Sequence, residues 1–345
     1  MFRVAAVLVS AFAAVSAGTW KEITTLTDIG LGIEFVSADV GYTVGAYNGE
    51  MGQWLLKTTN GGKNWTSTEF TPNFGISLCL AVEKDNVFVN SLFNSYISPD
   101  GGASWKNVTG LHAQGQGCRV ENGEFFVAGS GLLWGNGVLH SKTGDSFEGK
   151  NITSMPANMM AQFGAYPSAN TWYVSAGSFP QSDDDQSQKV GEHGSYSGAL
   201  LKSTDGGDSW DVLISEQNAF DFNMIDCADD NTCCSVGAGP NLGNVYCTTD
   251  GKTFTEVWNS TTTSMMTIRS QGSGNWVATG NVADGQAVYA SVLRSTDDGK
   301  TWTEDDLSTV PQTAVIDASF PTMNAGFILG IDRFNTLILL GYSAQ

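Results

Sequence analysis

The amino-acid sequence predicts an all-β fold, a seven-bladed β-propeller of four-stranded blades closed by an N-terminal strand. Three observations predict this fold. A turn motif occurs six times, a short apolar run precedes each copy, and the runs return roughly every 40 to 60 residues. Short strands repeated at this period are typical of propeller blades, because each blade is one antiparallel sheet.

The turn motif reads Ser/Thr-x-Asp-x-Gly-x-Ser/Thr-Trp. Its carboxylate and hydroxyl accept the N–H groups of a hairpin turn, and its Gly adopts the positive φ that the turn requires. In the first copy of the motif, Asn60 takes the place of the aspartate. The side chains expected to accept the turn N–H groups are Asn60, Asp100, Asp205, Asp250 and Asp297. The motif ends in an aromatic residue that we expect to pack on the core, at Trp65, Trp105, Phe147, Trp210, Phe254 and Trp302. We interpret all of these residues as structural.

The strands flank the motif in a constant order. The β-branched and aromatic runs that precede it end at Gly45, Asn90, Gly129, Gly177, Gly237, Gly280 and Gly330. Another apolar run lies on each side, so each unit is expected to be strand, strand, strand, motif, strand. The seventh unit stops after its third strand, and Trp20–Ile23 resembles the segment that follows each motif. We therefore expect the N-terminal segment to supply the missing strand and to remove the exposed sheet edges.

The motif resembles the Asp-box (BNR) repeat of β-propellers. The segment Leu200–Trp210, Leu-Leu-Lys-Ser-Thr-Asp-Gly-Gly-Asp-Ser-Trp, looks most like the photosystem II stability/assembly factor propellers. The resemblance covers residues 18–345 and implies seven blades in a single domain. Sialidases, xyloglucanases and sortilin-type receptors share the Asp-box, so the resemblance implies a fold more than a function.

Residues 1–17 are expected to be a secretory signal peptide, because an apolar stretch follows Arg3 and small residues precede Gly18. The protein is then extracellular, and its six cysteines are expected to form disulfides. Cys79 and Cys118 occupy equivalent places on adjacent innermost strands. Cys247 should face Cys233 or Cys234, and we favour the pairs Cys234–Cys247 and Cys227–Cys233.

Four Asn-x-Ser/Thr sequons predict glycosylation. Each asparagine lies at the end of a motif or within five residues after it, which places the set on or near the outermost strands: Asn64, Asn107, Asn151 and Asn259.

The charge balance excludes nucleic-acid binding as a function. The chain has 16 basic and 35 acidic residues and a formal charge of −19, and such a surface repels phosphates. After residue 17 no apolar run is long enough to span a membrane. We expect a monomer with no cofactor and no metal site.

Catalytic residues are sparse. A sialidase clamps its substrate carboxylate with three arginines, whereas residues 18–345 contain only Arg119, Arg269, Arg294 and Arg333. A xyloglucanase-like site needs a cleft between two propellers, and this chain supplies one. Acids expected on innermost strands are Glu34, Asp226 and Asp317, which we interpret as solvated lining of the channel.

The face opposite the Asp-boxes is the candidate binding face. It carries the aromatic residues Tyr47, Trp54 and Trp134, which either stack on a ligand or pack at the rim. An insertion at residues 178–198 carries Asp183, Asp184 and Asp185; calcium is the alternative there to a solvated loop. The sequence favours a secreted, non-catalytic propeller that binds a protein or glycan. The alternative is a secreted glycoside hydrolase of the sialidase/xyloglucanase-like type.

Overall fold

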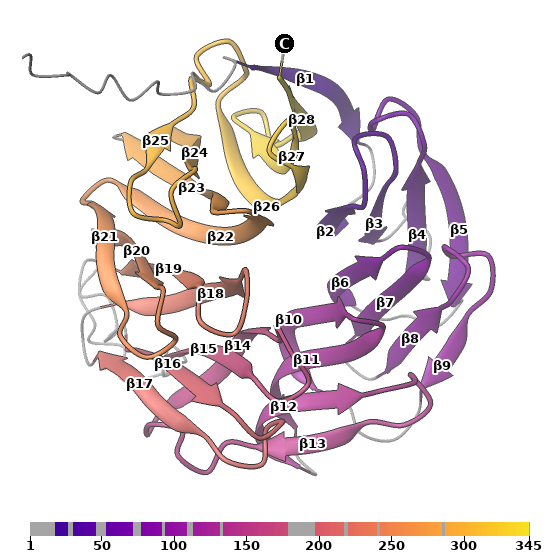
Figure 1. The fold of residues 1–345 in the computed structure, drawn as a ribbon. Coiled ribbons are helices and arrows are strands. Elements are labelled where there is room, and N and C mark those ends of the chain that lie inside the picture. The colour runs from indigo at the N-terminus through magenta and orange to yellow at the C-terminus, as the bar shows by residue number, and fades with distance from the viewer. Residues whose placement is uncertain are drawn as a thin grey trace, which may run out of the picture.

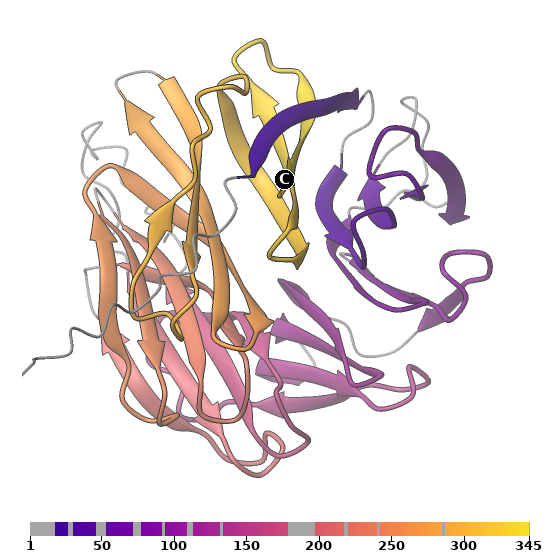
Figure 2. The same ribbon diagram turned by 45° about the horizontal axis from the view of Figure 1, so that its top comes forward.

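The computed structural model describes residues 18–26, 30–45, 53–71, 77–91, 94–108, 113–131, 134–178, 197–216, 220–239, 242–284 and 287–344. Within these residues, 28 strands form seven four-stranded antiparallel sheets. The sheets are arranged radially around a central axis (Figures 1 and 2). The predicted seven-bladed propeller is confirmed. The described part of the chain contains no helix that is long and apolar enough to cross a membrane.

The first six blades follow one another along the chain, and each begins with its innermost strand. Blades one to three consist of β2 (Gly30–Phe35), β3 (Gly41–Gly45), β4 (Gln53–Thr58) and β5 (Thr66–Thr71); β6 (Ser77–Glu83), β7 (Asn86–Ser91), β8 (Ser95–Ser98) and β9 (Lys106–Val108); and β10 (Gln114–Glu121), β11 (Glu124–Gly131), β12 (Gly135–Ser141) and β13 (Glu148–Asn151). Blades four to six consist of β14 (Met159–Ala165), β15 (Trp172–Ser178), β16 (Gly198–Ser203) and β17 (Asp211–Glu216); β18 (Asp221–Cys227), β19 (Cys233–Gly239), β20 (Leu242–Thr248) and β21 (Thr255–Ser260); and β22 (Thr263–Gly272), β23 (Asn275–Asp284), β24 (Ala287–Ser295) and β25 (Thr303–Glu304).

The seventh blade joins the two ends of the chain, as predicted. It contains β26 (Thr313–Thr322), β27 (Ala325–Asp332) and β28 (Leu337–Ser343), and its outermost strand is β1 (Thr19–Leu26). Figure 2 shows β1 alongside the C-terminal strands. Trp20 pairs with Tyr342 and is only 2% exposed. Burial of this side chain therefore holds the ring closed.

The apolar core lies between the blades, because each sheet buries both of its faces against its neighbours. Phe88 of β7, for example, belongs to one buried cluster with Val127 of β11 and Leu139 of β12. The middle strands accordingly read as nearly continuous apolar runs. Each blade thus depends on the next for its core, and this dependence makes ring closure important.

All seven innermost strands carry a β-bulge near the start, where the pairing with the second strand shifts. The shifts fall between Gly30 and Gly32, Ser77 and Cys79, Gln114 and Gly117, Ala161 and Phe163, Phe222 and Met224, Met265 and Thr267, and Val315 and Asp317. A bulge re-aims the side chains that follow it. The repeated bulge therefore determines which residues face the central channel.

Blade six departs from the expected pattern. Its outermost strand, β25, has only two residues and pairs with β24 only at Leu293 and Arg294. The carboxylate of the next residue, Asp305, accepts hydrogen bonds from the side chains of Arg294 and Trp20, at 2.9 and 2.8 Å. The N–H of Asp305 also donates to the carbonyl of Val292 in β24, at 2.9 Å. Asp305 therefore joins β24 to β1 of blade seven at the point where β25 ends.

Candidate functional site

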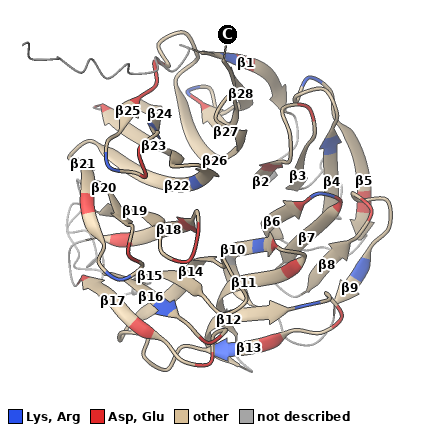
Figure 3. Ribbon diagram, viewed as in Figure 1, with Lys and Arg blue, Asp and Glu red and all other residues tan. Residues whose placement is uncertain are grey.

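The central channel is lined by the innermost strands, and Figure 3 shows basic residues on β10 and β22 and acidic residues on β2 and β18. In five blades the residue two positions after the bulge of the innermost strand occupies an equivalent level of the channel. These residues are Glu34, Arg119, Asp226, Arg269 and Ser319. Two arginines and two acids thus share one level of the channel.

Arg119 and Asp226 form an ion pair that links blade three to blade five. The Nη2 to Oδ1 distance is 3.0 Å, and the two side chains are 18% and 14% exposed. The other carboxylate oxygen of Asp226 accepts the backbone N–H of Ser270 in blade six, at 2.8 Å. Because a partly buried carboxylate needs such partners, this pair is structural, and Asp226 is more than solvated channel lining.

Other acids of the innermost strands also bind the next blade. Asp317 Oδ2 accepts the N–H of Ile33 at 2.9 Å. Glu121 accepts the N–H of Tyr166 at 3.1 Å, and Glu83 accepts the N–H of Gly123 at 2.7 Å. In each case a carboxylate of one blade satisfies a backbone donor of the following blade, so these acids connect neighbouring blades.

Glu34 differs from these acids. Its carboxylate faces the Ser319 hydroxyl, which donates to Oε1 at 3.4 Å, a long hydrogen bond. Burial raises the pKa of Glu34 to about 7, although the guanidinium of Arg269 opposes the change. Burial also raises the pKa of Asp317. Both acids lie on a cavity of about 230 Å³, together with Arg269.

The side chains at the bulges line the same cavity. They are Leu78, Gln162, Asn223, Met266 and Ile316. Sequence reasoning did not find them, because a bulge appears only when a strand is aligned with its partner. The cavity therefore combines amide and apolar side chains with one titratable carboxyl group that makes no strong hydrogen bond among the described residues.

The arginines do not form a carboxylate clamp. Arg269 Nη1 contacts the Sδ of Met224 at 2.7 Å and donates to the carbonyl of Ile268 at 3.1 Å. Arg294 is buried under blade seven, where it binds Asp305 and the carbonyl of Met323. Arg333 lies over the ring of Phe334 between β27 and β28. The four side chains occupy three separate places, so no three of them converge on one point.

The acids of the repeated turn motif form hydrogen bonds within their own turns. Asp100 accepts the hydroxyl of Ser98 at 2.8 Å and the N–H and hydroxyl of Ser104 at 2.8 and 2.6 Å. Equivalent bonds recur at Asp205 and Asp297. Asp250 accepts the N–H groups of Lys252 and Thr253. Asn60 accepts the N–H of Asn64. Hydrogen bonds from Ser104 and Ser209 lower the pKa of Asp100 and Asp205 to about 2. These contacts are those of turn caps.

The box aromatics pack inwards. Trp210 and Phe254 are 9% and 8% exposed, and the other four pack against the buried clusters from partly buried positions: Trp65, Trp105, Phe147 and Trp302. They are parts of the core between blades.

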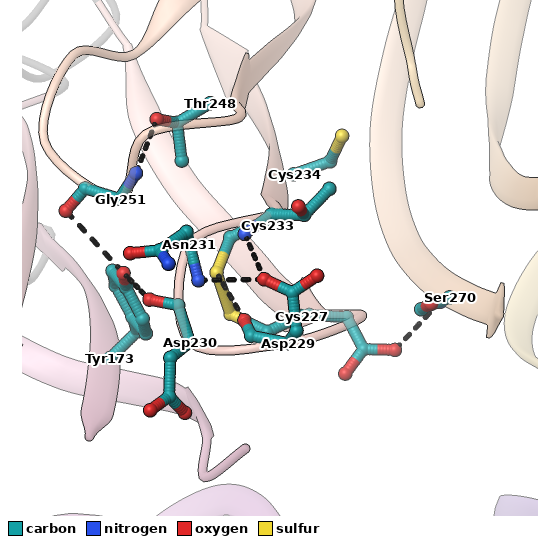
Figure 4. Close-up of a disulfide and its surroundings, with 12 residues drawn as sticks. Tyr173, Cys227, Asp229, Asp230, Asn231, Cys233, Cys234, Thr248, Gly251 and Ser270 are labelled. Carbon is teal, nitrogen blue, oxygen red and sulfur yellow. Dashed lines mark hydrogen bonds between the residues drawn. A yellow bond between two sulfur atoms is a disulfide. The ribbon is translucent and has the colours of Figure 1, made fainter. Parts of the chain in front are cut away.

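The three disulfides join the predicted pairs. Cys79–Cys118 links blades two and three, with Cα atoms 5.8 Å apart. Cys234–Cys247 joins β19 to β20. Cys227–Cys233 closes the turn between β18 and β19, where Figure 4 shows the Tyr173 hydroxyl reaching the carbonyl of Asp230. The two disulfides in blade five fix one sheet, whereas the first one connects two sheets.

The candidate binding-face residues lie in different environments. Tyr47 and the acidic run Asp183–Asp185 are outside the described residues. Trp54 is half-buried within β4, and Trp134 is half-buried and packs against the core cluster of blades two and three. Packing at the rim is therefore the better interpretation of both tryptophans.

The four sequon asparagines are all exposed. Three lie on the outermost strands β9, β13 and β21, whereas Asn64 lies in the first copy of the turn motif. The predicted location is therefore correct, and glycosylation itself stays a prediction.

No protein-family model and no curated protein matches this sequence. Among solved structures, YCF48 bound to D1 peptide is similar, with TM-score 0.62, 15% identity and coverage of 96% of this chain and 97% of that chain. YCF48 from Cyanidioschyzon merolae has a TM-score of 0.59 and 16% identity, with coverage of 94% of this chain and 98% of that chain. The GH74 xyloglucanase from Xanthomonas campestris has a TM-score of 0.62 and 12% identity, with coverage of 91% of this chain but only 52% of that chain. At these identities the comparisons show that the chain has the β-propeller fold of the YCF48 and GH74 structures.

Proposed function

We propose that this protein is a secreted, non-catalytic propeller that serves as a scaffold for a protein partner. The observation that carries the proposal is the use of the channel acids. Asp226, Asp317 and Glu121 each accept a backbone N–H of the neighbouring blade. Glycoside hydrolysis needs two carboxyl groups free to act on a substrate, one as acid and one as base or nucleophile. Among the described acids that line the channel, only Glu34 has a carboxyl group that is not held by a backbone N–H.

A protein partner is favoured over a glycan for two reasons. Trp54 and Trp134, the aromatic candidates for stacking on sugars, are half-buried, which reduces the ring surface available to a sugar. The similar YCF48 structure carries a bound peptide, according to its name. Propellers of this kind position loops on a rigid ring, where binding specificity is usually located.

The specific observation in favour of a hydrolase is Glu34, whose pKa of about 7 suits a general acid. An activity assay on a panel of glycans decides between the two functions. We expect no release of reducing sugar or sialic acid. Release that is abolished by Glu34→Gln or Asp317→Asn would establish the hydrolase instead.

The binding function is tested by affinity capture with the secreted protein, followed by titration of the purified partner. We expect one saturable protein partner, and binding that weakens with salt because the chain carries a net charge of −19. Failure of any protein to bind at a stoichiometric level would refute the proposal.

A further inference from the structure

Among the described residues, most of the outer edge of β24 in blade six is unpaired. The strand spans Ala287–Ser295, but β25 pairs only with Leu293 and Arg294. The one further backbone bond on this edge among the described residues runs from the N–H of Asp305 to the carbonyl of Val292, at 2.9 Å. No other described strand pairs with residues 287–291 on this side.

The free backbone groups on this edge can be identified. In an antiparallel strand, alternate residues direct both polar backbone groups to the same edge. The carbonyl of Val292 points outwards, since it binds Asp305. Ala290 and Val288 therefore direct their N–H and C=O groups outwards as well, and they present a short template for another strand.

A groove follows this open edge. Its volume is about 460 Å³, and it lies between β24 and residues 305–313. Ala290, Leu307 and Val310 line it, and all three are partly buried against the apolar cluster between blades six and seven. Val288 is 41% exposed. Hydrogen-bonding groups thus lie beside an apolar surface.

The charge of the groove indicates the chemistry of its occupant. Asp284, Glu304 and Asp305 line it, and no lysine or arginine does. Asp305 is neutralised by Arg294, whereas Asp284 is exposed at the end of β23. Glu304 accepts only the Ser291 hydroxyl among the described partners. Two carboxylates therefore remain available to a basic side chain.

We propose that the outer edge of β24 binds an extended, basic segment of the protein partner by β-strand addition. The added strand takes the place that β25 leaves empty, and its backbone pairs with Val288 and Ala290. An apolar side chain covers Ala290, Leu307 and Val310, and a lysine or arginine reaches Asp284 or Glu304. Main-chain hydrogen bonds supply affinity in this mode, and the side-chain contacts supply specificity. This inference rests on the proposed function and specifies its binding site.

The test uses a fluorescent peptide of alternating lysine and valine, acetyl-(Lys-Val)₃-amide, titrated against the folded protein. We expect saturable binding with a Kd below about 1 mM. The Lys-to-Glu peptide and a peptide N-methylated on alternate residues should not bind, because they lack the charge or the donors. Equal binding of the N-methylated peptide overturns the proposal, as does the absence of binding by the lysine peptide.

Protein variants locate the contact. Ala290→Pro removes an outward N–H and leaves the inner ladder intact, since proline is tolerated on edge strands, and it should weaken binding by about fivefold or more. Val288→Lys, at an exposed position that cannot disturb the core, should weaken it by charge repulsion. Glu304→Gln keeps the bond to Ser291 and should also weaken binding. Asp211→Asn, on exposed strand β17, is the matched charge control and should have no effect.

The natural partner separates this inference from the function itself. A partner that binds wild type and Ala290→Pro equally would overturn the edge site and leave the scaffold function standing. If the propeller binds the lysine peptide at this edge but captures no protein partner, the site is supported and the scaffold function is refuted.

Discussion

Removal of the Trp20 side chain should open the propeller ring. Trp20 is 2% exposed on β1, and its ring contacts those of Phe320 and Tyr342, with centroids 6.2 and 5.4 Å apart. Its Nε1 donates to Asp305 Oδ2 at 2.8 Å. This side chain therefore connects the first strand to blade seven and to the segment that leaves blade six.

The cost of Trp20→Ala follows from this environment. Truncation of a buried Trp to Ala typically costs about 3 to 5 kcal/mol. The hydrogen bond to the carboxylate accounts for about 1.5 to 3 kcal/mol of this cost. Trp20→Phe keeps most of the buried surface and removes only the donor, so it should cost about 2 kcal/mol. A domain is stable by about 5 to 15 kcal/mol, so the alanine variant loses a large share of its stability.

The assay is urea unfolding followed by far-UV circular dichroism, because a tryptophan substitution alters fluorescence directly. Lys21→Ala, at an exposed position on the same strand, is the control and should change the free energy of unfolding by less than about 0.5 kcal/mol. A Trp20→Ala variant within about 1 kcal/mol of wild type would show that β1 does not hold the ring closed.

Four further outcomes are expected. Hydrogen bonds keep the pKa of Asp100 and Asp205 at about 2, below the usual 3.8. Their contribution to stability is therefore complete above about pH 4 and is lost as the pH falls through about 2. A Tm that stays constant from about pH 5 to 2 would contradict this reasoning. The pKa of Glu34 is raised from 4.5 to about 7, so wild type should lose stability as pH rises through this interval, and Glu34→Gln should not; parallel Tm profiles argue against a buried carboxyl. Replacing both Cys79 and Cys118, which are 39 residues apart, by alanine should cost about 4 kcal/mol in urea unfolding, and an unchanged midpoint would count against the bridge. Enzymatic deglycosylation should lower the mass of the protein secreted from eukaryotic cells, and an unchanged mass would disprove the glycan sites.

Features that are set within one blade could be predicted from the amino-acid pattern alone. The motif at Ser98–Trp105 specifies its turn because Ser98 and Ser104 both donate hydrogen bonds to Asp100 within a single short segment. The apolar runs specify the strands by their local pattern. The disulfide Cys79–Cys118 was also predicted from the spacing of the two cysteines on neighbouring innermost strands. Their registers differ, because Cys79 is opposite Asn90 and Cys118 is opposite Val127. Because the motif and the strand pattern repeat, the local features of one blade predicted the fold of the whole ring.

The way in which the blades meet depends on contacts between residues that are far apart in the chain. The bonds from Asp226 to Ser270 and from Asp317 to Ile33 join residues 44 and 284 positions apart, and no local spacing encodes them. The bulges that line the channel exist only relative to the second strand of each blade. The residue that follows β25, Asp305, accepts a hydrogen bond from Trp20, 285 positions away. The channel and the open edge of β24 therefore depend on long-range packing, because side chains from different blades meet only when the ring has closed.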